Sequence, residues 1–349
     1  MIPQVVIIGD FLKDLDDEHA LCLAAYLHKQ GLIQLLCVIA NLKPASVRAR
    51  GAKGTLKLLG LPYVPVGIGM DVCGTVTHPY ELDIPYLAGL HEVTFDGPAL
   101  LQQTLEVAAD QSVVLVLQSG FTDAAALLAT RPGLCLRKIS HVAIMGGVVT
   151  ADGAVCLDEG GFLVPDNANN NMFDWPAALA VYTQLQKLGI PFVVTTKKAA
   201  YACQVPRSMY NLMTETGNPI GPCLTRRQVP AIESWWQAAC APPGSEVRGI
   251  LPPDRNRRWF IDVYCGGRDP GIPDYAPIWE YVQGLNLYDP INLVAAVPKL
   301  LAQFFEPTEV VVTGTTQRVI GVSKEKHGIK NPAALRDFII NGELSSLVL

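Results

Sequence analysis

The sequence lacks the surplus of basic residues that proteins binding nucleic-acid backbones usually carry. Its 349 residues include 27 Lys and Arg and 32 Asp and Glu, which gives a formal net charge of −5 at pH 7. Because Lys and Arg supply most of the affinity for a phosphate backbone, we expect no nucleic-acid polymer among the partners. Charged residues make up only 17% of the chain and hydrophobic residues 50%, a balance typical of a compact globular fold.

Long apolar runs are also absent. A helix that spans a bilayer needs roughly 18–20 consecutive apolar residues, whereas runs such as Val113–Leu117 have the length of a strand. The N-terminus, MIPQVVIIGD, has neither a basic region nor a small-residue cleavage site, so we predict a first strand there rather than a signal peptide. We therefore expect no membrane partner.

The nine cysteines are scattered, and no two of them form a C-x-x-C pair. This spacing disfavours a zinc site, and no motif indicates a catalytic cysteine. Several of them, such as Cys22, Cys37 and Cys135, lie within apolar stretches, as reduced thiols in protein cores do. The pattern predicts a cytoplasmic protein with reduced thiols.

Strand-like and helix-like segments alternate through the first 200 residues. The predicted strands are Val5–Ile8, Leu35–Ala40, Val64–Ile68, Val113–Gln118, Val142–Met145 and Phe192–Thr195. The predicted helices between them are Asp17–Lys29, Ala45–Leu59, Leu100–Asp110, Thr122–Thr130 and Pro176–Leu188. This alternation predicts an α/β fold with a mostly parallel central sheet and helices on both faces.

Residues from about 203 to 280 differ in composition from the rest. They are rich in Pro, Trp and Gly and weakly periodic, so we expect helices and long loops that form a cap or lid over the sheet. Beyond them, a helix is predicted over Asp289–Leu301 and a strand over Glu309–Val312. We interpret residues 1–349 as a single domain that carries this cap as an insertion.

Ligands of open parallel sheets bind beyond the carboxyl ends of the strands, so the residues that follow each strand are candidates for a site. These residues are Asp10, Asn41, Gln118 with Ser119, Gly146 with Gly147, and Thr195 to Lys198. Among them, Lys197 and Lys198 could contact an anionic group, although two adjacent lysines also suit a solvated turn.

The acidic loop, residues 10–18, contains five carboxylates, which belong to Asp10, Asp14, Asp16, Asp17 and Glu18. Like charges this close repel one another, and Ca²⁺ or Mg²⁺ would relieve the repulsion because both ions prefer oxygen ligands. The alternative is helix capping by Asp16 or Asp17, since acids are favourable at the positive end of a helix. Capping accounts for two of the acids but not for all five.

The acidic loop also resembles the N-terminal signature D-x-D-P-G-x-D-D of the nucleoside hydrolases, the inosine–uridine preferring nucleoside N-ribohydrolases. Asp16 and Asp17 match the final acidic pair, and Asp10 matches the first Asp. The second Asp of the signature, which in the family binds Ca²⁺ and deprotonates the attacking water, falls on Leu12, and the Gly falls on Asp14. The resemblance implies either that Asp10 or Asp14 supplies the missing carboxylate or that the usual base is absent.

Two strand ends continue the resemblance in the family's order. The segment VLVLQSGFTD places Gln118 where a backbone carbonyl of the family ligates the metal. The residues IMGG at 144–147 match the family's strand end I/L-M-G-G, although a plain glycine turn would explain the glycines alone.

Two later segments resemble the family as well. Residues 166–178 place Asn170 on an Asn that binds the ribose hydroxyls and Asp174 on a family Asp, although four Asn in five positions also suit a turn. Tyr288-Asp289-Pro290 resembles the family's H-D-P, in which the Asp binds the metal. Alone, it is typical of a helix start with Asp as N-cap. Tyr288 replaces a His that helps to protonate the leaving base in purine-cleaving members.

The resemblance implies hydrolysis of the N-glycosidic bond of a ribonucleoside or related ribosyl compound, with Ca²⁺ or alternatively Mg²⁺ as cofactor, in a homo-oligomer. The implied metal ligands are Asp10, Asp17, Gln118 and Asp289. The implied catalytic residues are Asp10, Asp14 and Tyr288. The implied substrate-binding residues are Asp16, Asn41, Asn169 and Asn170.

The sequence leaves three alternatives open. The leaving base would meet cap aromatics, for which the candidates are Trp235, Trp236, Tyr201 and Trp259, unless these residues pack in the core. A non-catalytic homologue that binds a nucleoside or sugar is an alternative that Leu12 and Tyr288 favour. An aspartate-nucleophile phosphatase is disfavoured, because the segment from Asp10 to Leu12 lacks the second acid of D-x-D.

Overall fold

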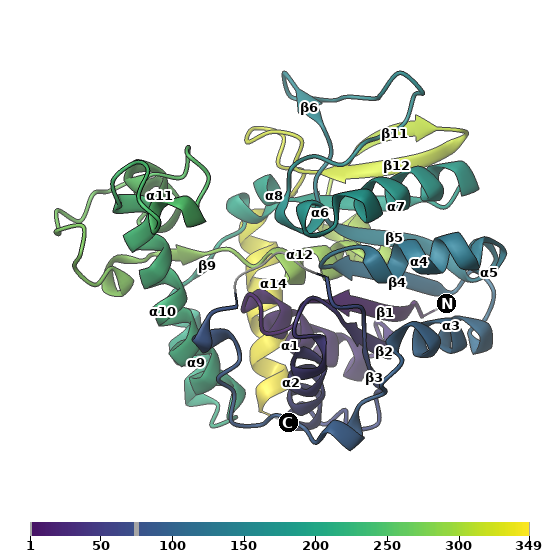
Figure 1. The fold of residues 1–349 in the computed structure, drawn as a ribbon, viewed down its shortest axis with the longest axis horizontal. Helices are drawn as coiled ribbons and strands as arrows, with labels where there is room; N and C mark the ends of the chain where they lie inside the picture. The colour runs from purple at the N-terminus through teal and green to yellow at the C-terminus, as the bar shows by residue number, and fades with distance from the viewer. Residues whose placement is uncertain (1, 73–76, 349) are drawn as a thin grey trace.

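The computed structural model describes residues 2–72 and 77–348, and its centre is a sheet of eight strands (Figure 1). The strands are β1 (Gln4–Gly9), β2 (Gln34–Ala40), β3 (Val66–Ile68), β4 (Val113–Gln118), β5 (Ile139–Gly146), β8 (Phe192–Thr196), β11 (Thr308–Val312) and β12 (Thr315–Ile320). Their order is β11-β12-β8-β5-β4-β1-β2-β3, and all neighbours pair in parallel except β11 and β12. The predicted mostly parallel sheet is confirmed.

Helices follow most strands. They are α1 (Asp16–Lys29), α2 (Ala45–Leu58), α3 (Gly97–Val107), α4 (Thr122–Thr130), α5 (Pro132–Lys138), α6 (Asn169–Phe173), α7 (Trp175–Leu188), α8 (Lys197–Ala202), α9 (Ser208–Glu215), α10 (Ile220–Cys240), α11 (Arg257–Tyr264), α12 (Tyr288–Ala295), α13 (Pro298–Phe304) and α14 (Pro332–Leu347). Short two-residue strands form the pairs β6–β7 (Thr150–Ala151, Ala154–Val155) and β9–β10 (Val205–Pro206, Gly284–Leu285).

Both faces of the sheet are buried, which explains why its strands are continuous apolar runs. Side chains of successive residues point to opposite faces of a strand. In β1, Val5 and Ile7 belong to the apolar cluster that includes α1, α2, α12 and α14. Val6 and Ile8 belong to the cluster that includes α3, α4 and α7. The helices therefore cover both faces, as predicted.

The register of the strands brings their carboxyl ends to one edge of the sheet. Gly9 at the end of β1 pairs with both Ala40 and Gln118, the last residues of β2 and β4. Gly146 at the end of β5 pairs with Thr196 at the end of β8. The loops that follow these strands consequently start side by side, and the site is built from them.

The segment predicted to form a cap contains α9, α10 and α11 and projects to the left of the sheet in Figure 1. Its core is continuous with that of the sheet, because the buried Trp236 and Phe260 belong to the same apolar cluster as Ile7. The longest helix, α10, contains Pro230, which cannot donate a backbone hydrogen bond and obscures the helix in the sequence.

Two expectations for the C-terminal region are wrong in detail. The helix predicted over Asp289–Leu301 is two helices, α12 and α13, because Pro298 begins a new helix after a break at Val297. Asp289 is not an N-cap either, since Leu287 holds that position. The chain then adds β12 to the sheet and packs α14 along α1, where buried Glu343 bonds His19.

The expectations about membrane-spanning segments and about the cysteines can be compared with the described residues. None of the helices within residues 2–72 and 77–348 is long and apolar enough to cross a membrane. The cysteines of this part of the chain are free thiols, as expected. Cys73 lies outside the described residues.

Candidate functional site

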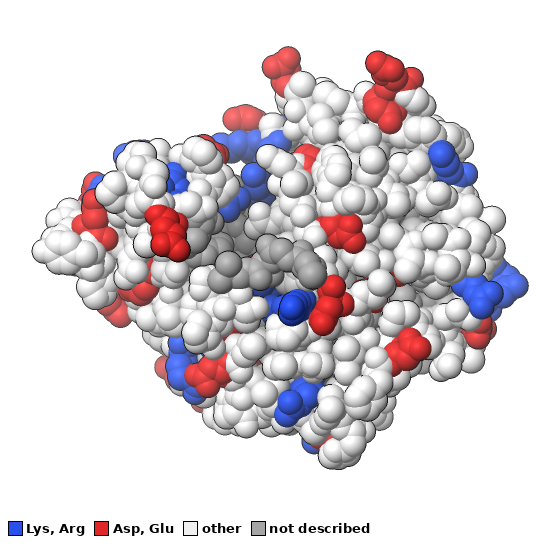
Figure 2. Space-filling view, viewed as in Figure 1, with Lys and Arg blue, Asp and Glu red and all other residues white. Residues whose placement is uncertain are grey.

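A cavity lies at the carboxyl edge of the sheet, between the sheet and the cap. Its walls come from the acidic loop, from the ends of β4 and β5, from the start of α12 and from α10 and α11 of the cap. Figure 2 shows this face of the molecule hollowed between the cap and the sheet. The structure therefore places a cavity where parallel sheets usually bind ligands.

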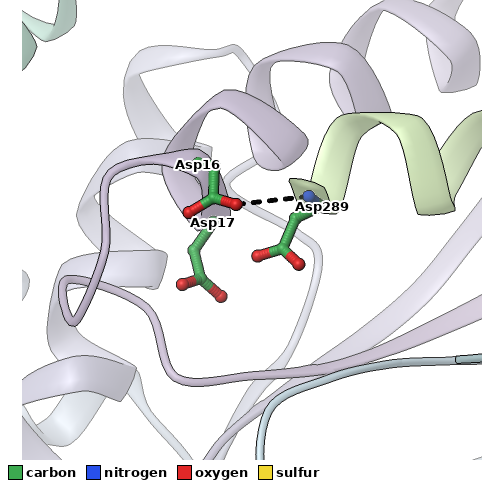
Figure 3. A group of neighbouring side chains, drawn as sticks. All are labelled: Asp16, Asp17 and Asp289. Atoms are coloured by element: carbon green, nitrogen blue, oxygen red, sulfur yellow. Dashed lines mark hydrogen bonds between the residues drawn. The ribbon is translucent and has the colours of Figure 1, made fainter. Parts of the chain in front are cut away.

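Three carboxylates converge in this cavity and are called here the acidic group: Asp16, Asp17 and Asp289 (Figure 3). Each offers one oxygen that lies within 4.8 Å of the others, and all three residues are buried. Asp16 and Asp17 open α1, whereas Asp289 lies in the first turn of α12. The two stretches predicted to meet at a metal do meet.

Asp16 joins the N-termini of the two helices. Its Oδ2 accepts hydrogen bonds from the backbone N–H of Tyr288 at 3.1 Å and of Asp289 at 3.3 Å. These amides belong to the first turn of α12 and have no partner within their own helix. The carboxylate that opens α1 thus caps α12, and the positive ends of both helix dipoles favour the negative charge gathered there.

Asp17 is the most tightly enclosed member of the acidic group. Its Oδ1 is buried and has no hydrogen-bond partner among the described residues. A Cβ atom added at Gly9 would lie 2.8 Å from this oxygen, so glycine at the end of β1 makes room for the carboxylate. A buried carboxylate oxygen without a donor carries a desolvation penalty that a bound cation would remove.

The pKa values of the acidic group also indicate a site for a cation. Burial, and then the charges of Asp10, Asp289 and Asp16, raise the pKa of Asp17 well above its usual range. Burial and neighbouring carboxylates also raise the pKa of Asp289. Hard divalent cations such as Ca²⁺ are bound by sets of carboxylate and carbonyl oxygens. The donor atoms present therefore fit such an ion.

Asp10 and Asp14, the two candidates for the missing base, both line the cavity but differ in exposure. Asp10 is buried, and burial together with the charge of Asp14 raises its pKa to about 7, against the influence of Arg48. Asp14 is exposed at the cavity. Neither belongs to the acidic group. The sequence predicts Asp10 as a metal ligand, but in the structure Asp16 takes that position with Asp17 and Asp289.

Leu12 turns away from the carboxylates. Its φ of 74° lies in the left-handed region, which is unfavourable for a residue with a branched side chain. The side chain is buried in a small apolar cluster with Ile84 and Cys223 and does not line the cavity. Where the family signature has a carboxylate in the site, this chain has an apolar side chain that packs outside the cavity.

The predicted sugar-binding asparagines divide into two groups. Asn169 and Asn170 line the cavity, and Asn170 Nδ2 donates to the carbonyl of Met145 at 3.1 Å, which fixes the amide beside the end of β5. Asn41 is buried outside the cavity lining and is fully engaged. Its amide donates to Gly120 O and Asp123 Oδ2, and its oxygen accepts from Ser119 Oγ.

Gln118 and Tyr288 lie where the sequence predicts them, at the cavity. Gln118 Nε2 donates to the carbonyl of Asp289 at 2.7 Å, and its Oε1 is buried without a partner in the described part of the chain. The side-chain oxygen is thus a second possible ligand besides the predicted carbonyl. The pKa of Tyr288 lies well above 10, because burial and then Tyr264 and Tyr201 disfavour the phenolate, so the hydroxyl keeps its proton.

The cap contributes residues that the sequence alone does not identify. Of the four aromatic candidates, Trp235 and Tyr201 line the cavity, whereas Trp236 and Trp259 do not. Further lining side chains are Gln228, Arg255 and Tyr264 from the cap and Lys13, Tyr80 and Asn286 from outside it. No motif marks the cap residues, because their place depends on how the cap folds back over the sheet.

The arrangement can perform three tasks. The acidic group can hold a divalent cation. Asp14 faces the cavity close to that group and can accept a proton from water, while the neutral Tyr288 can donate one. The asparagines and aromatic rings can bind a polar sugar and a flat base.

No protein-family model matches the sequence, and the search of curated proteins finds no match. Solved structures do match. The type III effector protein XopQ, in complex with adenosine diphosphate ribose, is 30% identical, with a TM-score of 0.84 over 100% of this chain and 94% of that one. The effector protein XOO4466 is 29% identical, with a TM-score of 0.83 over 100% of this chain and 95% of that one.

Enzymes share the fold at lower identity. A purine-preferring ribonucleoside hydrolase from Gardnerella vaginalis is 14% identical, with a TM-score of 0.61 over 99% of this chain and 100% of that chain. At this identity the similarity concerns the fold alone. It agrees with the layered α/β architecture and with the motifs in the sequence.

Proposed function

Since this chain belongs to the nucleoside hydrolase family as a divergent member, we propose that it hydrolyses the N-glycosidic bond of a ribosyl compound with the help of a divalent cation. The observation that carries the proposal is the acidic group, in which carboxylates from α1 and α12 meet in the cavity that Asn170 also lines. The similar effector XopQ was solved with adenosine diphosphate ribose, a ligand that contains the ribosyl group.

Asp17, Asp289 and Asp16, with an oxygen of Gln118, would hold Ca²⁺ or Mg²⁺. The cation would supply the positive charge that makes a nearby water more acidic. Asp14 takes the proton from the attacking water, because it is the carboxylate exposed at the cavity. The buried Asp10 adds negative charge next to Asp17.

The remaining residues bind and orient the substrate. Asn169 and Asn170 offer amide donors and acceptors to the ribose hydroxyls, and these contacts position the anomeric carbon. Cleavage of the glycosidic bond builds positive charge on the sugar ring, as in glycoside hydrolysis generally. The acidic carboxylates around the ring stabilise this charge, and Tyr288 protonates the leaving group or holds it by a hydrogen bond.

A direct test measures the free base released from a panel of ribosyl compounds: purine and pyrimidine nucleosides, nicotinamide riboside and adenosine diphosphate ribose. The full chain is incubated with Ca²⁺, with Mg²⁺ and with a chelator. We expect release that requires the cation and is lost in Asp289→Asn. Asp110→Asn, which changes an exposed carboxylate far from the cavity lining, serves as the matched control.

A second candidate is a ribosyl-binding protein without turnover, and the packing of Leu12 in an apolar cluster favours it. Calorimetry on the same compounds separates the two functions. Binding without release of the base by the wild-type chain would select the binding protein. Neither binding nor release for any compound would refute both candidates.

A further inference from the structure

Three basic side chains line the same cavity as the acidic group: Lys13, which forms an ion pair with Glu81, and Lys197 and Arg255. Lys197 comes from the sheet side, where it opens α8 directly after β8. Arg255 comes from the cap, in the loop that precedes α11. Figure 2 shows Lys and Arg side chains around the hollow between the cap and the sheet.

Arg255 differs from most arginines of the cap, whose charges are neutralised. Their ion pairs are Arg207–Glu280, Arg226–Asp83, Arg227–Glu18, Arg257–Asp269, Arg257–Asp274 and Arg258–Asp262. Within residues 2–72 and 77–348, Arg255 forms no such pair. An arginine left without a carboxylate at the wall of a cavity is available to an anionic ligand.

The structure holds the Arg255 guanidinium in place without neutralising it. The group lies 5.4 Å from the centroid of the Trp259 ring, and the backbone N–H donates to Pro252 O at 3.0 Å. A cation over an aromatic ring keeps its charge and its N–H donors for a further partner. The charge also acts on Tyr264 and Tyr288, which places the guanidinium near residues that line the cavity.

Lys197 and Lys198 are adjacent but have different roles. Lys198 Nζ donates to Val322 O at 2.6 Å and to Thr150 Oγ1 at 3.1 Å, so it ties α8 to neighbouring loops. Lys197 is exposed and forms no ion pair with any described residue, although its charge counters the effect of burial on Asp166. It is therefore the second cation that a ligand in the cavity can meet.

We propose that the ribosyl substrate carries a phosphate group and that Arg255 and Lys197 bind it. The inference rests on the proposed function, because it assigns the acidic group to the ribosyl end of the ligand. A guanidinium offers a planar set of donors that matches two phosphate oxygens, and an ammonium adds a point charge. Phosphate at the cations and ribose at the carboxylates give one ligand a defined direction in the cavity.

The test compares ribose 5-phosphate with ribose, titrated calorimetrically into the full-length chain in Ca²⁺. Hydrogen bonds to charged groups contribute about 1.5–3 kcal/mol, which corresponds to roughly 10- to 100-fold in affinity. We expect ribose 5-phosphate to bind at least about tenfold more tightly than ribose. Arg255→Gln should remove most of this difference and leave ribose binding unchanged, and Lys197→Gln should remove part of it.

Arg258→Gln is the matched control, since this exposed cap arginine pairs with Asp262 and does not line the cavity. Thermal unfolding of each variant checks its fold. Equal affinity of the wild-type chain for both sugars would overturn the inference and leave the proposed function intact. If Arg255→Gln lowered the affinity for ribose and for ribose 5-phosphate by the same factor, the inference would also be overturned, because the residue would then act on the fold and not on the phosphate. If neither sugar binds with or without Ca²⁺, the inference and the proposed function both fail.

Discussion

Glu18 and Arg227 form a buried ion pair that joins the helix of the acidic group to the cap, with 2.7 Å between Glu18 Oε2 and Arg227 Nη1. Glu18 directly follows Asp17 in α1, and Arg227 belongs to α10. The Arg227 guanidinium also donates to the carbonyls of Leu12 and Tyr80. One residue of the cap thus fixes both the acidic loop and a segment that lines the cavity.

Arg227→Ala should destabilise the protein strongly, because it leaves the Glu18 carboxylate buried without its cation. Removal of one partner from a buried pair costs about 3–5 kcal/mol. Urea denaturation measures the change in the free energy of unfolding. Arg226→Ala is the control, since Arg226 pairs with Asp83 at the surface and exposed pairs contribute about 1 kcal/mol or less. Similar losses in both variants would show that the buried pair has no special role.

Ca²⁺ should raise the unfolding temperature of the wild-type chain, because a ligand that binds the folded state stabilises it. Asp17→Asn and Asp289→Asn should abolish this rise. Without Ca²⁺ the same variants should be at least as stable as the wild type, since each removes one charge from a buried, mutually repelling group. Differential scanning fluorimetry with Ca²⁺ and with a chelator measures both effects. A wild-type response to Ca²⁺ in both variants would place the cation elsewhere.

The proposed base predicts a specific kinetic pattern. Asp14→Asn should lower kcat by about 10²–10⁴, the usual contribution of a general base, with little change in KM. Its Ca²⁺-dependent stabilisation should persist, because Asp14 lies outside the acidic group. In contrast to Asp14→Asn, Asp10→Asn should reduce the rise in unfolding temperature that Ca²⁺ causes, because the charge of Asp10 acts directly on Asp17. A wild-type kcat in Asp14→Asn would assign the proton transfer to another group.

The sheet could be predicted from the sequence because its strands are buried on both faces. The bounds of β4 and α4 agree with the prediction at both ends, and those of β1 and β2 agree within one residue. The helix α10 could not be recognised, since Pro230 interrupts its pattern although the surrounding packing tolerates it.

The acidic loop could be predicted because it follows a buried strand, whereas Asp289, Asn169 and Asn170 could be predicted only because their segments resemble those of the nucleoside hydrolases. The bond from Asp16 to the α12 amides and the position of Arg255 could not, because both depend on contacts between segments far apart in the chain. Asn41 follows a strand as predicted, but a local network with Ser119 and Asp123 holds it away from the cavity. Position at a strand end therefore selects candidates, and hydrogen-bond partners decide among them.

His141 should contribute to the loss of stability in mild acid. It lies on β5, and its Nε2–H donates to the carbonyl of Ala296 at 2.8 Å. Burial, and to a lesser degree the charge of Arg318, lower its pKa below 6.5, although the bond to Ala296 opposes the shift. Below about pH 6.5 the unfolded chain therefore binds a proton that the folded chain does not, and the free energy of unfolding decreases as the pH falls.

His141→Gln keeps a donor for Ala296 and cannot take up the proton, so its free energy of unfolding should decrease less than that of the wild type between pH 7.5 and pH 5. Urea denaturation of both proteins at the two pH values measures the difference. His91→Gln changes an exposed histidine on the short turn Leu90–Glu92 and serves as the control. If the wild type and His141→Gln lose the same stability over this range, the half-buried imidazole is not a source of the acid sensitivity.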